Sequence, residues 1–263
     1  MRVYKSLFEP AESDNFHDFF GKSEGIPVKR IAEKGVESAF VFIEKELSFD
    51  SEYKNEVSTS VGKELKRLLK SVGVTKKGLI LTVGVGNQGM TADALGGRTL
   101  KYLDITEHLN AAGAKSRGRG RLAGLAPGVG GVTGIDSFDV VKGVTDRLKP
   151  AAVIAVDTLS ARNATRLKSV VQLSTDGLVP GSGVGNAKRA LDDKNLGVPV
   201  IALGVPLVIE ALDIRTEGDP TPVSKEVRTT LEGLVVTVKE IDLAVEDFAE
   251  VIGHAINFAV HGT

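Results

Sequence analysis

Cysteine is absent from the 263-residue sequence, which excludes disulfides, thiolate nucleophiles and cysteine-ligated metal sites. The sequence also has no excess of positive or negative charge, because its formal net charge is −1. The net charge therefore provides no general electrostatic attraction to nucleic acid or anionic membranes. No apolar run approaches the length of a membrane span, and the first ten residues lack the apolar core of a signal peptide. We therefore expect a cytoplasmic protein with neither membrane nor nucleic-acid contacts.

The length allows one large α/β domain or two small ones. Apolar runs of strand length alternate with amphipathic helical patterns, which predicts a mostly parallel, twisted sheet with helices on both faces. We treat residues 1–263 as a single domain with three parts. They are an N-terminal extension, 1–50, whose structure the pattern leaves open, a core that carries the motifs, 78–212, and a C-terminal helix, 237–261.

Two acidic residues follow apolar runs of strand length in the core. Residues 79–83 read as a buried strand, and Thr91 caps the following helix, which extends to about Leu109 and carries Asp93 in its first turn. Residues 151–157 read as a second buried strand that ends on Asp157. If the two strands are parallel neighbours, both acids lie at one sheet edge, where open α/β sheets usually bind ligands.

The remaining chain supplies further elements. We expect strands at 39–44, 170–173 and 199–206, helices at 51–72 and 136–148, glycine-rich loops at 125–134 and 180–186, a basic loop at 115–121 and a polar linker at 217–224. Pro206 is expected to open a helix after its strand, and a capping box at Thr237–Glu240 to start the last helix.

A dinucleotide fingerprint, G-x-G-x-x-G, is matched by residues 84–89 after a strand. Asp104 stands at the distance where a ribose-binding acid is sought, but that acid should end a second strand. Residues 94–102 have helical composition and leave no room for that strand. A nucleotide-dependent enzyme is therefore the third-ranked reading.

The two acids allow three interpretations: solvent-facing helix caps and strand ends, a catalytic pair, or ligands of a divalent metal. In a close pair one carboxyl keeps its proton while the other acts as base on water, which is chemistry that hydrolyses an amide. The histidines, at positions 17, 108, 254 and 261, show no metal-ligand spacing, and each alone is more often structural. His108 is the one nearest to the acids in the sequence.

The second glycine-rich loop is a plain turn or a set of backbone N–H donors for a substrate carbonyl. Its candidate positions are Ser182, Gly183, Gly185 and Asn186. The serine lacks the glycine two positions earlier that a nucleophile elbow requires, since Pro180 stands there.

Six segments occur in an order and spacing that resemble the germination protease family, endopeptidases that degrade small acid-soluble spore proteins. They are Gly84–Asn87, Thr91–Gly96, Pro127–Ile135, Val153–Arg162, Pro180–Asn186 and Ile201–Pro206, and the end of the last helix, Asn257–Gly262, is similar as well. The segment between Asp213 and Thr237 is much shorter than in typical members. Together these motifs are far more specific than the dinucleotide fingerprint.

The resemblance implies a three-layer, phosphorylase/hydrolase-like α/β/α fold shared with hydrogenase-maturation endopeptidases. It further implies a homo-oligomer, with a tetramer expected, working in the spore core on small acid-soluble spore proteins. The two essential aspartates of the family fall on Asp93 and Asp157, and Asn87, His108 and the loop 182–186 are second-rank candidates for positioning. We expect no cofactor; if a divalent metal binds, Asp93, Asp157 and His108 are its candidate ligands. The alternative to an endopeptidase is a non-catalytic binding or regulatory homologue of the same fold.

Overall fold

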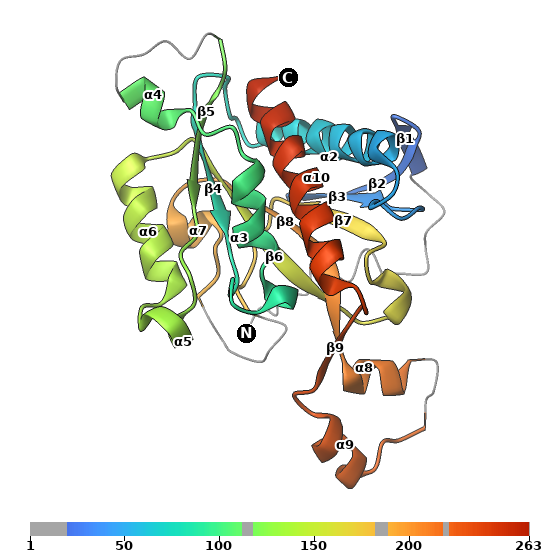
Figure 1. The fold of residues 1–263 in the computed structure, drawn as a ribbon. Helices are drawn as coiled ribbons and strands as arrows, with labels where there is room; N and C mark the ends of the chain where they lie inside the picture. The colour runs from blue at the N-terminus through green and yellow to red at the C-terminus, as the bar shows by residue number, and fades with distance from the viewer. Residues whose placement is uncertain (1–19, 112–117, 182–188, 218–220, 263) are drawn as a thin grey trace.

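The computed structural model describes residues 20–111, 118–181, 189–217 and 221–262. The strands of this part form one sheet in the order β1-β2-β3-β7-β8-β6-β4-β5, and β9 pairs with β8 (Figure 1). The strands are β1 (Phe20–Ser23), β2 (Ile26–Glu33), β3 (Val36–Phe42), β4 (Leu79–Gly84), β5 (Arg121–Leu125), β6 (Ala152–Ala161), β7 (Val170–Ser174), β8 (Val200–Glu210) and β9 (Val235–Thr237).

The sheet is mixed. Strands β5, β4, β6 and β8, which carry most of the motifs, run parallel to one another, as the alternation of strands and helices predicts. The pairs that join β1, β2, β3, β7 and β8, and the pair of β8 with β9, are antiparallel. Strands β1 and β2 lie in the N-terminal extension before the strand that was predicted at 39–44, which corresponds to β3. The α/β class is confirmed, with an antiparallel half added to the parallel one.

Helices cover both faces of the sheet, which gives the predicted three layers. The helices are α2 (Ser51–Ser71), η1 (Thr91–Asp93), α3 (Leu95–Thr99), η2 (Leu100–Tyr102), α4 (Glu107–Ala111), α5 (Gly130–Thr133), α6 (Ser137–Leu148), η3 (Ala164–Arg166), α7 (Asp193–Leu196), α8 (Ala211–Thr216), α9 (Lys225–Leu231) and α10 (Ile241–His261). Helices α2, α3 and α10 pack on one face, and α6 and α7 on the other. No helix among the described residues is long and apolar enough to cross a bilayer.

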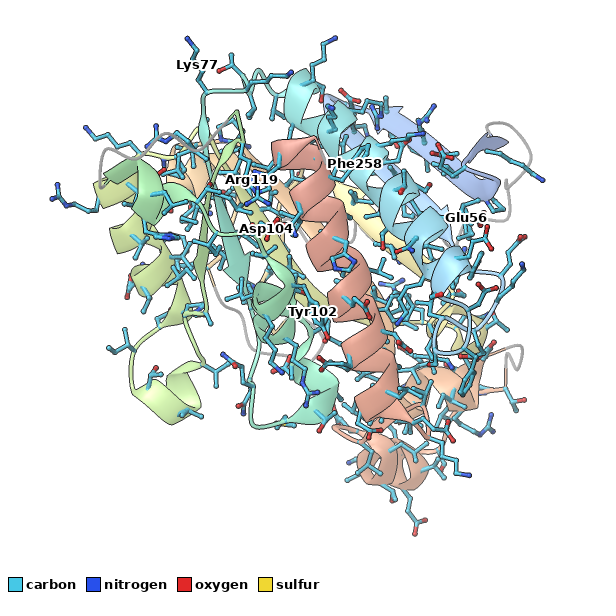
Figure 2. The ribbon with its side chains drawn as sticks, turned by 45° about the horizontal axis from the view of Figure 1, so that its top comes forward. Glu56, Lys77, Tyr102, Asp104, Arg119 and Phe258 are labelled. Atoms are coloured by element: carbon cyan, nitrogen blue, oxygen red, sulfur yellow. The ribbon has the colours of Figure 1, made fainter. Side chains whose placement is uncertain are left out.

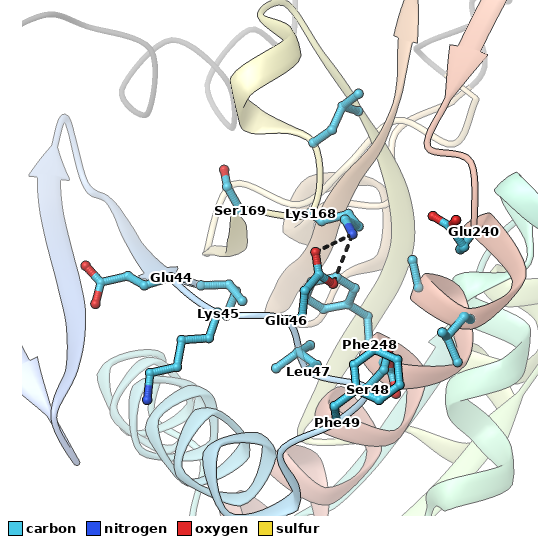
Figure 3. A pocket seen from close by; sticks show the side chains of 15 residues that line it. Glu44, Lys45, Glu46, Leu47, Ser48, Phe49, Lys168, Ser169, Glu240 and Phe248 are labelled. Atoms are coloured by element: carbon cyan, nitrogen blue, oxygen red, sulfur yellow. Dashed lines mark hydrogen bonds and ion pairs between the residues drawn. The ribbon is translucent and has the colours of Figure 1, made fainter.

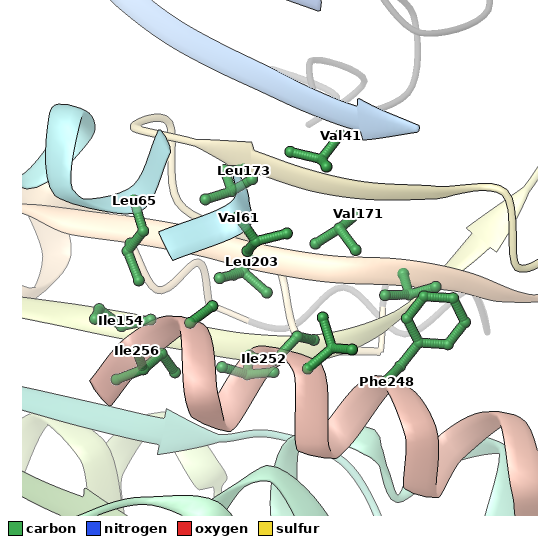
Figure 4. Packing of buried hydrophobic residues seen from close by; sticks show 14 of the residues in the cluster. Val41, Val61, Leu65, Ile154, Val171, Leu173, Leu203, Phe248, Ile252 and Ile256 are labelled. Carbon is green, nitrogen blue, oxygen red and sulfur yellow. The ribbon is translucent and has the colours of Figure 1, made fainter. Parts of the chain in front are cut away.

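The larger core lies between the sheet and the two long helices. Figure 4 shows Leu65 of α2 and Ile252 of α10 over Leu203 of β8, all fully buried. Helix α2 starts where the Asp50 carboxylate accepts a hydrogen bond from Tyr53 N at 2.9 Å. Burying each large apolar side chain contributes about 1.5–3 kcal/mol, so this layer stabilises the packing of α2 and α10 on the sheet.

The predicted start of the helix after β4, its length and the predicted helix at Pro206 are wrong. The helix expected from Thr91 to about Leu109 is divided into η1, α3, η2 and α4, and Met90 rather than Thr91 precedes it, without a side-chain cap. Strand β8 runs through Pro206, which opens no helix. A register shift between Leu159 and Ser160 lies opposite this proline, and such irregularities accept a residue without an N–H.

The chain after β8 also differs from expectation. Helix α9, capped by Ser224, follows the predicted polar linker, and α8 precedes it (Figure 1). Thr237 belongs to β9, where its hydroxyl donates to Leu207 O at 2.6 Å, so it caps no helix. Helix α10 begins only at Ile241, but it buries the predicted apolar face. The shortened segment 213–237 therefore contains regular structure: α9 lies apart from the main body of the molecule, and β9 returns the chain to the sheet (Figure 1).

Candidate active site

Asp157 lies within β6 rather than at its end. The strand continues to Ala161, so the prediction that it stops at the acid is wrong. The Asp157 side chain is only 6% exposed, and its Oδ1 accepts a hydrogen bond from Thr158 N at 2.9 Å. The parallel ladder with β4 stops one residue earlier, at the pair Gly84–Val156. Asp157 is thus the first residue of β6 beyond the end of β4.

Asp93 lies in η1, on the segment that follows β4. Its Oδ2 accepts a hydrogen bond from Asn87 N at 2.7 Å. Gly86 has φ +104°, and a Cβ there would collide with the Asp93 backbone oxygen and lie 3.0 Å from its Oδ1. Only glycine permits this backbone and this approach. The turn after β4 therefore folds back onto Asp93 and fixes its carboxylate.

A close packing of backbones brings the Asp93 segment to the strand that carries Asp157. Val85 N donates to Val156 O at 2.8 Å. A Cβ on Gly96 of α3 would collide with the same Val156 oxygen, and one on Gly84 would collide with Gly96 O. Both acids are therefore at the carboxyl end of β4, as their positions after parallel neighbouring strands predict.

Hydrogen bonds tie the same segment to α10. Glu246 accepts from Tyr102 Oη at 2.6 Å and from Arg98 Nη1 at 2.9 Å. The bond to Glu246, together with burial, raises the pKa of Tyr102 to about 12, and the two donors lower the pKa of Glu246. These bonds hold α3 and η2 against α10 (Figure 2).

Asn87 is part of this arrangement, mainly through its backbone. Its N–H binds Asp93, while its side-chain Oδ1 accepts from Gly89 N at 3.0 Å and closes the turn. Ser182, Gly183, Gly185 and Asn186 lie outside the described residues.

His108 lies at the other end of the parallel strands. It is exposed on α4, next to Glu107, whose carboxylate pairs with Arg121 at the start of β5. Arg121 is in register with Leu79, and a strand of six residues spans about 16 Å from there to the carboxyl end. The suggestion from sequence proximity that His108 joins the two acids is therefore wrong. Across the described part of the chain, no three His, Cys, Asp or Glu residues form a group that could hold a metal ion.

The features of a dinucleotide site are incomplete. The turn at 84–89 does follow β4, but Asp104 ends no strand. Its carboxylate pairs with Arg119 at 2.6 Å, and its N–H donates to Asn257 Oδ1 at 2.8 Å. Figure 2 shows Asp104 and Arg119 side by side. An acid held in this way is not presented to a ribose.

A cavity of about 500 Å³ lies elsewhere, between residues 43–49, residues 167–169 and the start of α10. Figure 3 shows Lys168 bound to Glu46 at its wall, with Phe248 nearby. Its lining includes neither Asp93 nor Asp157. No sequence pattern marks it, because three distant segments form it.

Comparison with known proteins identifies the family. The sequence profile of the germination proteases matches residues 36–219. Germination proteases from Caldanaerobacter subterraneus (36% identity), Bacillus mycoides (38%) and Clostridium acetobutylicum (33%) align with 66%, 64% and 83% of this chain. The alignments cover 63%, 46% and 76% of these relatives, so the chain spans between about half and three quarters of their length.

Among solved structures, a NiFe hydrogenase maturation protease from Thermococcus kodakarensis is similar. It is 18% identical, with a TM-score of 0.36, over 72% of this chain and 98% of that one, which is too weak a likeness to establish a common fold. The sequence profile spans well over half of the chain and includes both aspartates and the turn that binds Asp93. The chain belongs to the germination protease family.

Proposed function

We propose that this chain is an endopeptidase whose two working carboxylates are Asp93 and Asp157. The observation that supports this most directly is the packing of the Asp93 segment against the strand residue that precedes Asp157. Membership of the germination protease family supports the same class of activity.

The chemistry needs one protonated and one ionised carboxyl. Two acids at hydrogen-bond or one-water distance do not both ionise readily, so one keeps a proton. The ionised carboxylate removes a proton from water, the resulting hydroxide attacks the peptide carbonyl, and the other carboxyl protonates the leaving nitrogen. Backbone N–H groups of the loop 182–186 would bind the carbonyl oxygen.

The proposed substrates are small acid-soluble spore proteins, cleaved in the spore core by a homo-oligomer. The names of the relatives support germination as the setting. Sedimentation of the purified chain tests the assembly, and a monomer at micromolar concentration would contradict it.

The decisive experiment incubates the purified chain with a small acid-soluble spore protein and maps the fragments by mass spectrometry. Asp93→Asn and Asp157→Asn should each abolish cleavage while preserving the circular dichroism spectrum, because an amide keeps the shape but cannot exchange the proton. Asp104→Asn is the matched control, since it removes an exposed acid paired with Arg119 at the opposite end of the strands. Full activity in either of the first two variants would remove that residue from the site. Binding without cleavage by the native chain would favour the non-catalytic homologue.

A further inference from the structure

A buried glutamine lies in the same row of the sheet as Asp157. In β6, Asp157 pairs with Gly204 of β8, and Gly204 pairs with Gln172 of β7. Residues paired directly across strands project to the same face. The alternation agrees, because Val171 and Leu173 pack in the core on the opposite face. The Gln172 carboxamide and the Asp157 carboxylate therefore project from one face.

Between the two, the strand β8 contributes no side chain. A Cβ on Gly204 would lie 2.6 Å from Asp157 O and 2.7 Å from Leu159 Cγ, so the position accepts only glycine. Two strand spacings of about 4.8 Å separate the backbones of Asp157 and Gln172. An extended peptide covers that distance in about three residues, so one bound substrate reaches both groups.

The carboxamide oxygen of Gln172 can accept a hydrogen bond. Gln172 is 2% exposed, and its Oε1 has no hydrogen-bond partner within the described structure. A buried amide oxygen without a partner costs stability, and a bound ligand that donates a hydrogen bond to it would offset that cost. A side chain of similar volume without polar atoms, such as methionine, would fill the same space at no such cost.

We infer that Gln172 contacts the substrate, its Oε1 accepting a hydrogen bond from a backbone N–H of the extended polypeptide that the two aspartates cleave. This inference rests on the proposed endopeptidase function and adds a substrate-binding residue to it. The hydrogen bond forms before and during the reaction, so its loss raises KM and leaves kcat little changed.

The test is Gln172→Met, examined by thermal unfolding and by cleavage of a small acid-soluble spore protein. Removal of the unpartnered amide should raise the Tm by about 2–6 °C. KM should rise about five- to tenfold, the loss of one neutral hydrogen bond, with kcat within about twofold. If Gln172 has a purely structural role, the Gln172→Met substitution would lower the Tm and leave KM unchanged.

Thr145→Val is the matched control, because Thr145 of α6 also buries a side-chain oxygen without a partner, away from the acids. It should raise the Tm and leave KM unchanged. Suppose that the native chain cleaves and Asp157→Asn does not. The inference about Gln172 alone is then overturned if Gln172→Met has an unchanged KM, loses activity only in kcat, or has a lower Tm. If the native chain does not cleave, the proposed function fails and this inference fails with it.

Discussion

Substitution of Gly96 by alanine is expected to displace the segment that holds Asp93. Gly96 lies in α3, where its Cα faces the backbone of two strands. An added Cβ would lie 2.5 Å from both N and O of Val85 and would collide with Val156 O. These atoms belong to Val85, the residue that follows β4, and to β6 just before Asp157, so the clash falls directly between the two proposed catalytic segments.

The cost follows from what can move. A flexible side chain would turn away from the new methyl group, but here all three neighbouring atoms are backbone, and Val156 O already accepts from Val85 N. Overpacking a well-packed site costs typically about 1–3 kcal/mol and occasionally more. With three backbone atoms in the way we expect about 3 kcal/mol, which for a chain of this size lowers the Tm by about 6–12 °C.

Urea unfolding, followed by circular dichroism, measures this loss, and the cleavage assay should show activity falling further than the folded fraction does. Gly143→Ala is the matched control. Gly143 is solvent-exposed and lies in the middle of α6, and no atom comes within 4 Å of an added Cβ. Alanine should therefore stabilise the chain by about 0.5–1 kcal/mol. A Gly96→Ala variant within about 1 kcal/mol of the native stability would refute the close packing on which the site depends.

Three further outcomes are expected. Glu64→Gln should lower the free energy of unfolding by about 2 kcal/mol at pH 7, because Glu64 is buried and accepts hydrogen bonds from Arg30 and Arg67. Burial raises the pKa of Glu64, but the bonds to the two arginines outweigh burial and lower its pKa below 4.5. The ionised carboxylate therefore stabilises the fold fully above pH 4.5, and this stabilisation is lost as the pH falls through the lowered pKa. The difference in unfolding free energy between the native chain and Glu64→Gln should shrink in urea titrations toward pH 3. A chelator should leave cleavage unchanged; activity lost to it and restored by one divalent ion would establish a metal mechanism. Calorimetry should show no micromolar binding of nicotinamide or adenine nucleotides, because Asp104 ends no strand and its carboxylate is paired with Arg119.

Periodicity predicts the long helices and the parallel strands β4, β6 and β8, because their patterns are strong, but it missed the five-residue parallel strand β5, whose two ends were assigned to loops. Helix α2 repeats apolar residues every three or four positions, and all of Val57, Val61, Leu65 and Leu68 are buried. Strands β1 and β2 were missed since their two-residue turns, Glu24-Gly25 and Lys34-Gly35, place a non-glycine residue at positive φ. Neither turn contains the Asn or Asp that normally signals such a hairpin.

The helix after β4 was predicted too long for a different reason. Its composition is helical, but at Gly96 and Gly97 the chain packs too closely against its neighbours to accept a side chain. A Cβ on Gly97 would lie 2.6 Å from the Gln88 side chain. Tertiary packing therefore decides this segment, and local propensity does not reveal it. The error at His108 has a similar origin. His108 follows Asp93 closely in the sequence, but the two residues lie at opposite ends of the parallel strands.

The ends of the strands explain how residues from four segments gather at one place. Strand β4 stops at Gly84, one residue short of Asp157, so β6 has no strand neighbour on that side at the acid. The turn that replaces β4 there binds Asp93 through Asn87 N. On the other side β8 continues, and its glycine leaves the Gln172 side chain in the same row. Unequal strand lengths, rather than a sequence motif alone, thus place the Asp93 turn on one flank of Asp157 and the unpartnered amide oxygen of Gln172 on the other.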